Sequence, residues 1–227
     1  ALGALVAVWR AHCRRRFDVI HLHEPLAPGP TTTALFLAAA PMVGTFHAAG
    51  GSLAYDVMNR GVRWLNRRLD RSFAVSEDAA AMASASLGGE YEILFNGVEV
   101  HRSREVAPWP TEGPTVFFIG RHEPRKGLTV LLDAMSHLPA NVRLWVAGDG
   151  PATEALRSRV AGDGRISWLG RISDEERTAR IRGADVFCTP SLRGESFGVV
   201  LLEACCSPGW CRPLPVGVGM SRASCRE

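Results

Sequence analysis

Three cationic side chains lie close together in the segment GRHEPRKG, residues 120–127. They are Arg121, Arg125 and Lys126, and Lys126 is the only lysine among the 26 basic residues. An apolar run typical of a strand, residues 115–119, ends directly before the segment, and leucines at helical spacing follow it. Arginine offers a planar fork and lysine a compact point charge, so together they suit a diphosphate whose negative charge grows as it departs. The segment therefore predicts an anion-binding loop; the alternative is a solvated basic loop.

Two glutamates form a second candidate site in the segment GESFGVVLLE, residues 194–203. Glu195 lies where the pattern predicts the start of a helix, and the helix macrodipole favours a carboxylate there. Free backbone N–H groups at a helix start can also bind a phosphate. Glu203 follows eight residues later, two turns along an apolar helix and on its flank. The alternative is a helix-capping glutamate followed by a partly exposed one.

Three histidines lie in or directly after predicted strands in the first half of the chain. His47 follows the apolar run 41–46, at the carboxyl end of a strand, although a lone histidine there is also compatible with a structural role. His21 and His23 are two residues apart on a predicted strand, so they share a face and could bind a metal ion. The sequence places no third ligand, and Glu24-Pro25 favours a loop that shapes a cleft instead.

These side chains need strands and helices that bring them together. Eight short apolar runs alternate with longer stretches compatible with helices. This alternation predicts a doubly wound α/β fold, in which parallel sheets carry helices on both faces through right-handed crossovers. Ligands of such sheets bind beyond the carboxyl ends of the strands, where the cationic segment and His47 fall. The predicted strands are residues 18–22, 41–46, 72–75, 92–95, 115–119, 142–147, 165–168 and 185–189.

The alternation is interrupted once, by residues 99–113, whose sequence EVHRSREVAPWPTEG has no strand or helix period. We predict an interdomain linker there. Residues 1–98 would then form part of one Rossmann-like domain, and residues 114–204 part of another. Each is too short for a complete sheet of this kind, and we expect the chain, which starts at Ala1, to begin inside a longer protein.

The end of the chain differs in composition from the rest. Residues 205–227 contain four of the six cysteines and three prolines, and they show no periodicity. The cysteines have no histidine among them, and their spacing does not fit a zinc site. We therefore predict an aberrant, disordered tail of the kind that a shifted reading frame would produce.

Composition excludes several classes of protein. The chain has 227 residues, of which 46% are apolar and 22% charged, as in a globular protein. A net charge of +3 is far from the strongly basic balance of nucleic-acid-binding proteins. The longest nearly unbroken apolar stretch, residues 34–43, is about half the length that a membrane-spanning helix needs. Cys13 and Cys188 lie in apolar surroundings typical of buried thiols, so we expect a reducing, cytoplasmic compartment.

A predicted helix over residues 53–71 separates apolar from basic side chains. A basic stripe of this kind predicts peripheral contact with an anionic membrane, at the inner face of the cell membrane. The alternative is a solvated helix face, which is the commoner role of charged stripes. The apolar side consists of Met58, Val62, Leu65 and Leu69, and the basic side of Arg60, Arg63, Arg67 and Arg71.

The two glutamates reproduce the E-x7-E pattern of retaining glycosyltransferases of family 4. Three further segments occur in that family's order: the turn Asn96-Gly97-Val98, the cationic loop GR…RKG and the run Gly148-Asp149-Gly150-Pro151. Over residues 18–204 the chain therefore resembles this family. The segments HLHEPLAP, GTFHA, FAVSEDA and GRHEPRKG are similar to those of bacterial phosphatidylinositol mannosyltransferases.

The resemblance implies a GT-B fold, in which two Rossmann-like domains face each other across a cleft. The first domain would lie on the acceptor side, and the second would bind most of the nucleotide-sugar. In this family a loop arginine and lysine hold the donor diphosphate, and they correspond to Arg121 and Lys126. The chain contains no D-x-D pair, the Mg²⁺-binding pattern of the other main class of glycosyltransferases. We therefore expect the two cations to act without a metal ion or another cofactor.

The resemblance also implies roles for the residues of the E-x7-E segment. Glu195 would contact the transferred sugar, and Glu203 would contact the ribose of the nucleotide. Backbone amides near Phe197 and Gly198 would bind the phosphates. His47 corresponds to a histidine that lies near the donor sugar in this family.

The implied reaction is transfer of a hexose, with mannose as the first candidate, to a hydroxyl of a lipid or glycan with retention of configuration. The donor would be a nucleotide-diphosphate sugar such as GDP-mannose. The alternative is a nucleotide- or sugar-binding remnant without turnover, because neither the glycine-rich first turn nor the final helices of a complete GT-B enzyme are found. A dinucleotide oxidoreductase is a weaker alternative, since no G-x-G-x-x-G follows a strand. We expect no nucleic-acid partner.

Overall fold

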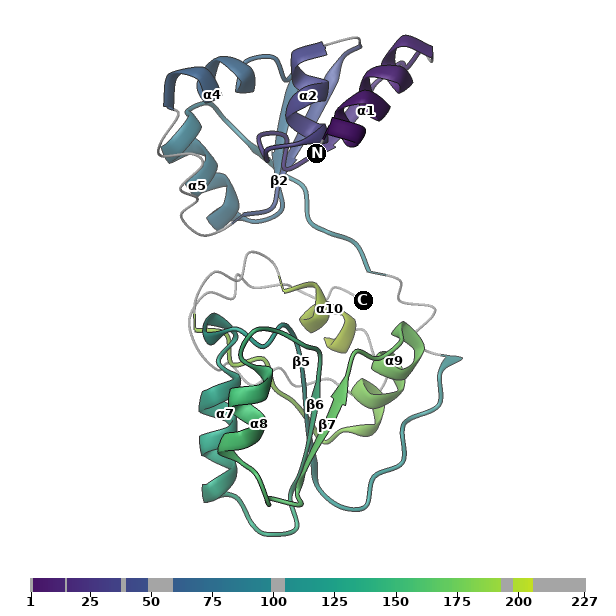
Figure 1. Cartoon of the computed structure of the whole chain (residues 1–227), viewed down its shortest axis with the longest axis vertical. Helices are drawn as coiled ribbons and strands as arrows, with labels where there is room; N and C mark the ends of the chain where they lie inside the picture. The colour runs from purple at the N-terminus through teal and green to yellow at the C-terminus, as the bar shows by residue number, and fades with distance from the viewer. Residues whose placement is uncertain are drawn as a thin grey trace. The chain divides into compact units, whose positions relative to one another are not determined.

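The computed structural model describes residues 2–14, 16–37, 40–48, 59–98, 105–192 and 198–205. The chain divides into two units, one that runs to Asn96 and one that starts at Gly97. Each unit contains a four-stranded sheet with helices packed on it (Figure 1). All strand pairs in both sheets are parallel, as the alternation of strands and helices in the sequence predicts.

The sheet of the first unit, sheet A, has the strand order β1-β2-β3-β4. Its strands are β1 (Ile20–His23), β2 (Met42–Phe46), β3 (Arg71–Ala74) and β4 (Glu92–Ile93). The helices described in this unit are α1 (Leu2–Arg14), α2 (Pro30–Leu37), α4 (Asn59–Asn66) and α5 (Glu77–Leu87). His23 pairs in register with Thr45, so the loops that leave β1 and β2 meet at the carboxyl edge of the sheet.

The core of the first unit lies between β2 and its flanking helices. Phe46, Leu35 and Met42 are all buried. Tyr91 packs edge-on against Phe46, with the ring centroids 5.1 Å apart. At the amino end of β2, the backbone N–H of Met42 donates to the carboxylate of Asp70 over 2.7 Å. These contacts fix the strand whose carboxyl end carries the predicted histidine.

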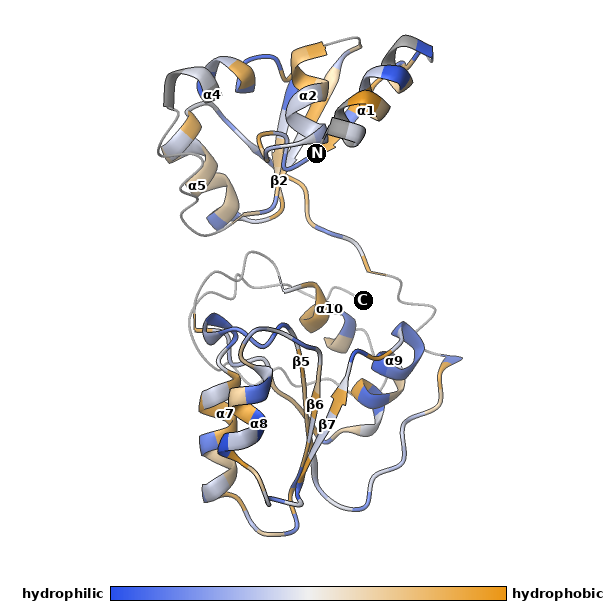
Figure 2. Ribbon diagram, viewed as in Figure 1, coloured by the Kyte–Doolittle hydropathy of each residue, from blue (hydrophilic) through white to orange (hydrophobic). Residues whose placement is uncertain are grey.

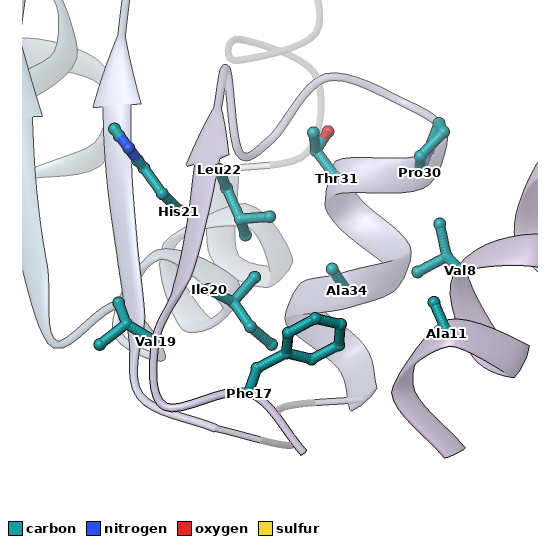
Figure 3. A pocket seen from close by; sticks show the side chains of 10 residues that line it. All are labelled: Val8, Ala11, Phe17, Val19, Ile20, His21, Leu22, Pro30, Thr31 and Ala34. Carbon is teal, nitrogen blue, oxygen red and sulfur yellow. The ribbon is translucent and has the colours of Figure 1, made fainter. Parts of the chain in front are cut away.

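An apolar pocket of about 360 Å³ lies between α1, β1 and α2 (Figure 3). Side chains from both helices, from the strand and from the residues before it converge on the pocket, among them Val8, Ala34, Ile20 and Phe17. The ring of His21, which also borders the pocket, is directed away from Phe17 and Ala34. The pocket is thus formed mainly by hydrocarbon, and the imidazole is turned toward the neighbouring strand.

The sheet of the second unit, sheet B, has the strand order β7-β6-β5-β8. Its strands are β5 (Thr115–Ile119), β6 (Arg143–Ala147), β7 (Ile166–Gly170) and β8 (Val186–Phe187). The α-helices are α7 (Leu128–Ala134), α8 (Thr153–Arg159), α9 (Asp174–Gly183) and α10 (Val199–Cys205). Two short 3-10 helices are η1 (Pro124–Lys126) and η2 (Met135–His137). Figure 1 shows α7 and α8 on one side of the sheet and α9 and α10 on the other.

Each face of sheet B has its own apolar cluster. Phe118 and Leu144 pack with residues of α7 and α8, whereas Phe117 and Trp145 pack with residues of α9 and α10. Successive side chains of a strand point to opposite faces, which is why β5 and β6 supply both clusters. Figure 2 shows hydrophobic residues along these strands and a mostly hydrophilic α9. The continuous apolar sequence of β5 thus reflects a strand covered on both faces.

Helix α9 holds the segment that precedes β5. Arg180 is buried between Trp109 and Trp145, with its guanidinium carbon 4.1 and 4.7 Å from their ring centroids. Its Nε also pairs with a carboxylate oxygen of Glu176 at 2.8 Å. The backbone N–H of Trp109 donates to the carbonyl of Ala179 over 2.8 Å. The residues around Trp109, within the predicted linker, therefore pack on the second unit.

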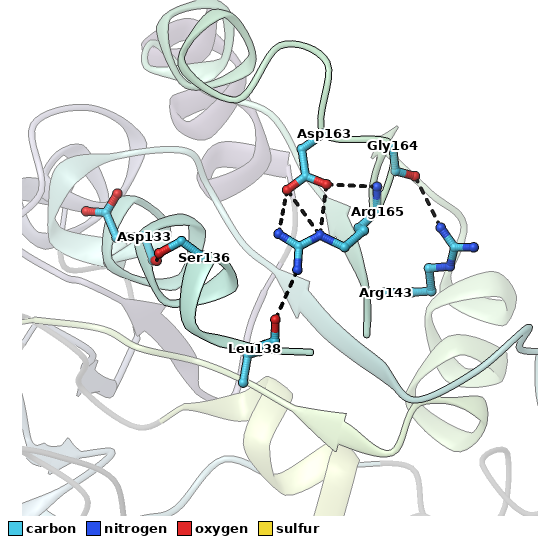
Figure 4. A network of polar contacts seen from close by, with 7 residues as sticks. All are labelled: Asp133, Ser136, Leu138, Arg143, Asp163, Gly164 and Arg165. Carbon is cyan, nitrogen blue, oxygen red and sulfur yellow. Dashed lines mark hydrogen bonds and ion pairs between the residues drawn. The ribbon is translucent and has the colours of Figure 1, made fainter. Parts of the chain in front are cut away.

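At the amino ends of β6 and β7, arginines tie the turns together (Figure 4). Arg165 forms a forked contact with Asp163, with Nη2 2.8 Å and Nε 3.3 Å from Oδ2. The Arg165 guanidinium also donates to the carbonyl of Leu138 over 3.4 Å, and Arg143 donates to that of Gly164 over 3.5 Å. Hydrogen bonds from Arg165 hold the pKa of Asp163 below its usual range. This network braces the end of the sheet away from the carboxyl edge.

The structure corrects the predicted helix over residues 53–71. Residues 49–58 lie outside the described residues, and α4 ends at Asn66. Arg71 is the first residue of β3, and its Nη1 lies 3.3 Å from a carboxylate oxygen of Glu92 on β4. The arginine spacing continues past the end of the helix, into a strand that sheet A requires. The predicted stripe of four helical arginines was therefore wrong in its last two members, because Arg67 lies in the turn after α4 and Arg71 lies in β3.

All eight predicted strands are present; residues 115–119 match β5 at both ends, and the other seven have shifted ends. The largest loss of length is at β8, which spans only Val186–Phe187 where residues 185–189 were expected. Strand β4 also ends early, at Ile93 instead of Phe95. Both strands lie at the edges of the sheets as described, where a partner on one side only supplies fewer hydrogen bonds. Within the described ranges, no helix has both the length and the apolar character needed to cross a bilayer.

The described residues test the predictions about the cysteines and the tail only in part. Cys188 is a free thiol packed against the cluster of α7 and α8, and burial raises its pKa. The side chain of Cys13 and residues 206–227 lie outside the described residues. The predicted disorder of the tail therefore stays a prediction, although its first residue, Cys205, is the last residue of α10.

Candidate functional site

The carboxyl edge of sheet B gathers three loops around one pocket. The loops follow β5, β6 and β7, and parallel strands bring their carboxyl ends to the same edge. The pocket has a volume of about 340 Å³. Its lining residues are Ile119 at the end of β5, Gly120 and Arg121 after β5, Gly148, Asp149 and Gly150 after β6, and Arg171 after β7.

Glycines allow the first two of these loops to touch through their backbones. Gly148 has φ +105°, and a Cβ on it would lie 2.0 Å from the carbonyl oxygen of Gly120. A Cβ on Gly150 would lie 2.7 Å from the backbone nitrogen of His122. The same nitrogen donates to the carbonyl of Asp149 over 3.1 Å. Backbone atoms of the two loops are therefore in direct contact beside the pocket, and a larger residue at either glycine would push them apart.

Two titratable groups at this junction, the buried His122 and the exposed Asp149, have shifted pKa values. The ring of His122 is 1% exposed, its Nδ1 lies 2.8 Å from the hydroxyl of Thr153, and its burial lowers its pKa. The carboxylate of Asp149 accepts hydrogen bonds from the backbone of Gly150 at 2.7 Å and from Thr153 at 3.1 Å. These bonds lower the pKa of Asp149. At neutral pH the histidine is therefore uncharged and the aspartate ionised.

The cationic loop is organised by the carboxylate between its arginines. Glu123 lies 3.0 Å from Nη2 of Arg121 through one oxygen and 2.9 Å from Nε of Arg125 through the other. The side chain of Arg121 is 70% exposed, whereas that of Glu123 is 20% exposed. Arg121 is therefore oriented by Glu123 while most of its guanidinium is open to a ligand. Lys126 is the last residue of η1.

The end of this loop is fixed against the segment that follows β8. Gly127 has φ +69°, and a Cβ on it would lie 1.9 Å from the carbonyl oxygen of Pro190. The backbone N–H of Leu192 donates to the carbonyl of Arg125 over 2.8 Å. The final glycine of the GRHEPRKG segment therefore serves a close backbone approach, which fixes the loop directly after Lys126.

Of the two predicted glutamates, only the second lies among the described residues. Glu203 is on α10 and pairs with Nη2 of Arg177 on α9 at 3.0 Å. Arg177 also binds Asp174, at the start of α9, at 2.8 Å. The side chains of Glu203 and Arg177 are each 27% exposed. Glu195 and Phe197 lie outside the described residues, and Gly198, with φ +72°, directly precedes α10.

In the first unit, His47 lies beside two other imidazoles. Nδ1 of His23 is 2.8 Å from Nε2 of His47, and Nε2 of His21 is 2.7 Å from the hydroxyl of Thr45. Burial and the neighbouring His23 lower the pKa values of His21 and His47. Among the described residues, no set of three histidines, cysteines or carboxylates is arranged to hold a metal ion. The metal-binding alternative for His21 and His23 thus gains no third ligand there.

The structure adds residues that the sequence reasoning did not single out. Arg171 lines the pocket of sheet B, and Arg177 holds Glu203. Arg171 directly follows an apolar run, which is the signal that could have identified it. No comparable signal exists for Arg177, because its contact joins two helices that are far apart in the sequence.

Comparison with known proteins decides the family. The sequence model for Glycosyltransferase Family 4 matches residues 1–102, and that for Glycosyl transferases group 1 matches residues 99–211. The chain belongs to the family 4 glycosyltransferases. It is 40% identical over 197 residues to a phosphatidyl-myo-inositol mannosyltransferase of Mycobacterium leprae, with 83% of this chain and 52% of that protein covered. The corresponding enzyme of Mycolicibacterium smegmatis is 41% identical over 199 residues, with 83% and 51% covered.

Solved structures of glycosyltransferases share the fold. Anabaena Alr3699/HepE in complex with UDP and glucose has a TM-score of 0.72 at 19% identity, with 91% of this chain and 60% of that chain covered. Sucrose-phosphate synthase of Thermosynechococcus elongatus has a TM-score of 0.69 at 20% identity, with 88% and 56% covered. The predicted GT-B fold class is thereby confirmed. The chain spans about half the length of the curated relatives that it matches.

Proposed function

We propose that this family 4 glycosyltransferase chain takes part in retaining transfer of mannose from a nucleotide-diphosphate sugar, with GDP-mannose as the first candidate. The acceptor would be a hydroxyl of a lipid or glycan, most simply a phosphoinositide. The observation that carries the proposal is the pocket at the carboxyl edge of sheet B, lined by Arg121 and Arg171. The names of the relatives support it: two are phosphatidyl-myo-inositol mannosyltransferases, and the Anabaena structure contains UDP and glucose.

The donor diphosphate would bind to Arg121 and Lys126. Arg121 is exposed yet oriented by Glu123, and Lys126 ends the 3-10 helix η1 in the same loop. A charge-assisted contact of this kind is about twice as strong as a neutral hydrogen bond. As the sugar–oxygen bond breaks, negative charge accumulates on the departing diphosphate, and the two cations would stabilise it without a metal ion.

The remaining donor contacts follow the roles that the family implies. Glu203 would bind the ribose through its carboxylate, which Arg177 already orients. Glu195 would face the transferred sugar, and the backbone amides near Phe197 and Gly198 would bind the phosphates. His47 would contact the donor sugar. An anionic side chain suits a sugar carbon that becomes positively charged in the transition state.

Peripheral contact with an anionic membrane belongs to the same proposal, in a revised form. The helix α4 exposes Trp64, whose ring lies 6.3 Å from that of the exposed Phe36 on α2. Arg68 lies over Trp64 at 5.1 Å, and Arg63 and Arg67 are exposed nearby in the sequence. Aromatic rings flanked by arginines suit the interface of a bilayer with anionic headgroups. The protein would thus be cytoplasmic and act at the inner face of the cell membrane.

Vesicle sedimentation tests the membrane part. We expect binding to vesicles that contain phosphatidylinositol at low salt, weakened in the double variant Arg63→Ala/Arg67→Ala and at high salt, because surface charges are screened. Arg71→Ala is the matched control, since this arginine lies on β3 and pairs with Glu92. Equal binding of both variants would contradict membrane contact through Arg63 and Arg67, which would then belong to a solvated surface.

Two experiments test the donor part. Calorimetric titration with GDP, UDP and ADP and with their sugar derivatives should identify one preferred base, with GDP-mannose favoured. A transfer assay with that donor and phosphatidylinositol vesicles should then yield a mannosylated lipid of retained configuration. Binding without any transfer would favour the second candidate, a nucleotide- or sugar-binding remnant, which the half-length match to the relatives keeps open. Absence of nucleotide binding would contradict both.

A further inference from the structure

Three imidazole rings form a row at the carboxyl edge of sheet A. The ring centroids of His21 and His23 are 4.5 Å apart, and those of His23 and His47 are 5.1 Å apart. The planes of each pair are tilted by 34°. His23 is the central member, and a hydrogen bond of 2.8 Å joins its Nδ1 to Nε2 of His47. The orientation of the His47 ring therefore depends on the ring beside it.

Glu24 holds the main chain of the same loop. Its φ is +49°, the only positive φ of a non-glycine residue in the described ranges. Its Oε1 accepts hydrogen bonds from the backbone N–H groups of His47 at 2.5 Å and Ala48 at 2.7 Å. Its own N–H donates to the carbonyl of Thr45 over 2.9 Å. A residue with such a strained backbone persists only where its surroundings hold it, and here three hydrogen bonds join Glu24 to the end of β2 and to the two residues directly after it.

We propose that His23 and Glu24 are positioning residues for His47, the first acting on its ring and the second on its main chain. The inference rests on the proposed function, which assigns His47 to the donor sugar. Because Nε2 of His47 is bonded to His23, the nitrogen that His47 can offer to a sugar is Nδ1. In a neutral pair only one of the two bonded nitrogens carries the proton, so the tautomers of the two rings are coupled.

The charges around the ring support a neutral His47. Burial is the largest cause that lowers its pKa, His23 lowers it further, and the carboxylate of Glu24 acts in the opposite direction. His21, at the far end of the row, has its pKa lowered by burial and by both other imidazoles. A neutral ring can hydrogen-bond a sugar without repelling the positive charge that develops on the sugar during transfer.

Nitrogen-15 NMR of the imidazoles in the full chain tests the positioning without any donor. We expect one dominant tautomer of His47 and a pKa below 6.5. In His23→Phe the tautomers should mix and the pKa of His47 should rise, because a group that lowers it is removed. His137→Phe, a change of an exposed histidine in the second unit, is the matched control and should leave the His47 signals unchanged. Unaltered His47 signals in His23→Phe would overturn the proposal.

Glu24 offers a conservative rescue. Glu24→Gln keeps an oxygen that can accept both backbone N–H groups, so His47 should retain its tautomer while its pKa falls. Glu24→Ala removes the acceptor, and the His47 signals should then broaden or split. Equal spectra for the two variants would contradict the role of Glu24. If His23→Phe does not fold, as judged by its amide spectrum, His23→Asn provides the ring-free variant.

Kinetics then separate this inference from the proposed function. We expect kcat for transfer to fall about 10- to 100-fold in His23→Phe and in Glu24→Ala, since a small misplacement of a contact group can cost that much. Glu24→Gln should retain most of the activity, and the affinity for the free nucleotide should not change. Normal kcat in a variant with altered His47 spectra would overturn the positioning role in catalysis. If the wild-type protein shows the expected His47 spectra but no transfer, the proposed function would be contradicted while the positioning of His47 by His23 and Glu24 would stand.

Discussion

At the carboxyl edge of sheet B, glycines bring two loops into backbone contact, whereas at the edge of sheet A side chains hold the loops together. Gly148 and Gly150 leave no room for a side chain against the loop after β5. In sheet A, the corresponding junction consists of the carboxylate of Glu24 and the bonded rings of His23 and His47. The first arrangement frees space for a ligand, and the second fixes one side chain.

The electrostatics of the two edges differ in the same way. Sheet B presents exposed cations, Arg121 and Arg171, around a pocket that contains the ionised Asp149. Sheet A presents His21 and His47, whose pKa values lie below 6.5, so these two imidazoles are neutral at pH 7. An edge of the first kind suits a phosphate, and one of the second kind suits hydroxyl groups. The two edges therefore differ in the ligand chemistry that each favours.

The largest expected effect comes from filling the glycine contact of sheet B. Gly148→Ala should lower the free energy of unfolding of the second unit by about 3 kcal/mol or more, because it adds backbone strain and a steric clash. Gly162→Ala is the matched control: its φ is +91° but nothing lies within 4 Å of the added carbon, so about 1–2 kcal/mol is expected. Urea unfolding followed by tryptophan fluorescence measures both. Equal losses would mean that the close approach of Gly148 to Gly120 does not contribute to the destabilisation.

The second effect concerns the cations of the pocket. Lys126→Ala should weaken binding of the nucleoside diphosphate by about 1–3 kcal/mol, the range for a charge-assisted contact. Arg159→Ala, on α8 and paired with Asp133, removes a similar charge away from the carboxyl edge and should leave the affinity unchanged. Calorimetry at constant salt concentration measures both. An unchanged affinity in Lys126→Ala would remove this residue from the donor site.

A smaller effect is expected for the ion pair between α9 and α10. Glu203→Gln and Arg177→Ala should each weaken binding of the free nucleotide by about 1 kcal/mol. The double variant should lose less binding free energy than the sum of the two single losses, because the residues act as a unit. Glu195→Gln should affect only the sugar-nucleotide. Calorimetry with GDP and GDP-mannose distinguishes these cases. Additive losses for the pair would show that Arg177 does not orient Glu203.

The smallest effect is a difference in pH dependence. The folded pKa values of His21 and His47 lie below the ordinary value of 6.5, so the unfolded chain binds more protons as the pH falls. Their contribution to stability is therefore complete above pH 6.5 and is lost as the pH decreases through the folded pKa values. The double variant His21→Asn/His47→Asn should flatten this slope in urea unfolding between pH 5 and 8. A slope identical to that of the wild type would assign the acid sensitivity to other groups, such as the buried His122.

Much of the fold follows from the sequence because parallel, doubly covered strands leave a continuous apolar signal. Residues 115–119 were predicted as a strand with the ends that the structure shows. The helix over residues 53–71 was too long because helical spacing of arginines does not reveal where a neighbouring strand must begin. Arg71 leaves the helical pattern for β3. Edge strands such as β8 are shorter than predicted, because the apolar character of a segment does not show how many neighbouring strands supply it with hydrogen bonds.

The sequence by itself determined the types of residue that stand at the strand ends: the cationic loop with Arg121 and Lys126, and His47 after β2. Each is a local signal, a polar side chain directly after an apolar run. Only the tertiary structure decided which groups act on them. Arg177 reaches Glu203 across 26 positions, and His23 reaches His47 across 24. Such contacts depend on strand register and helix packing, which arise from the whole core and leave no trace in the spacing of neighbouring residues.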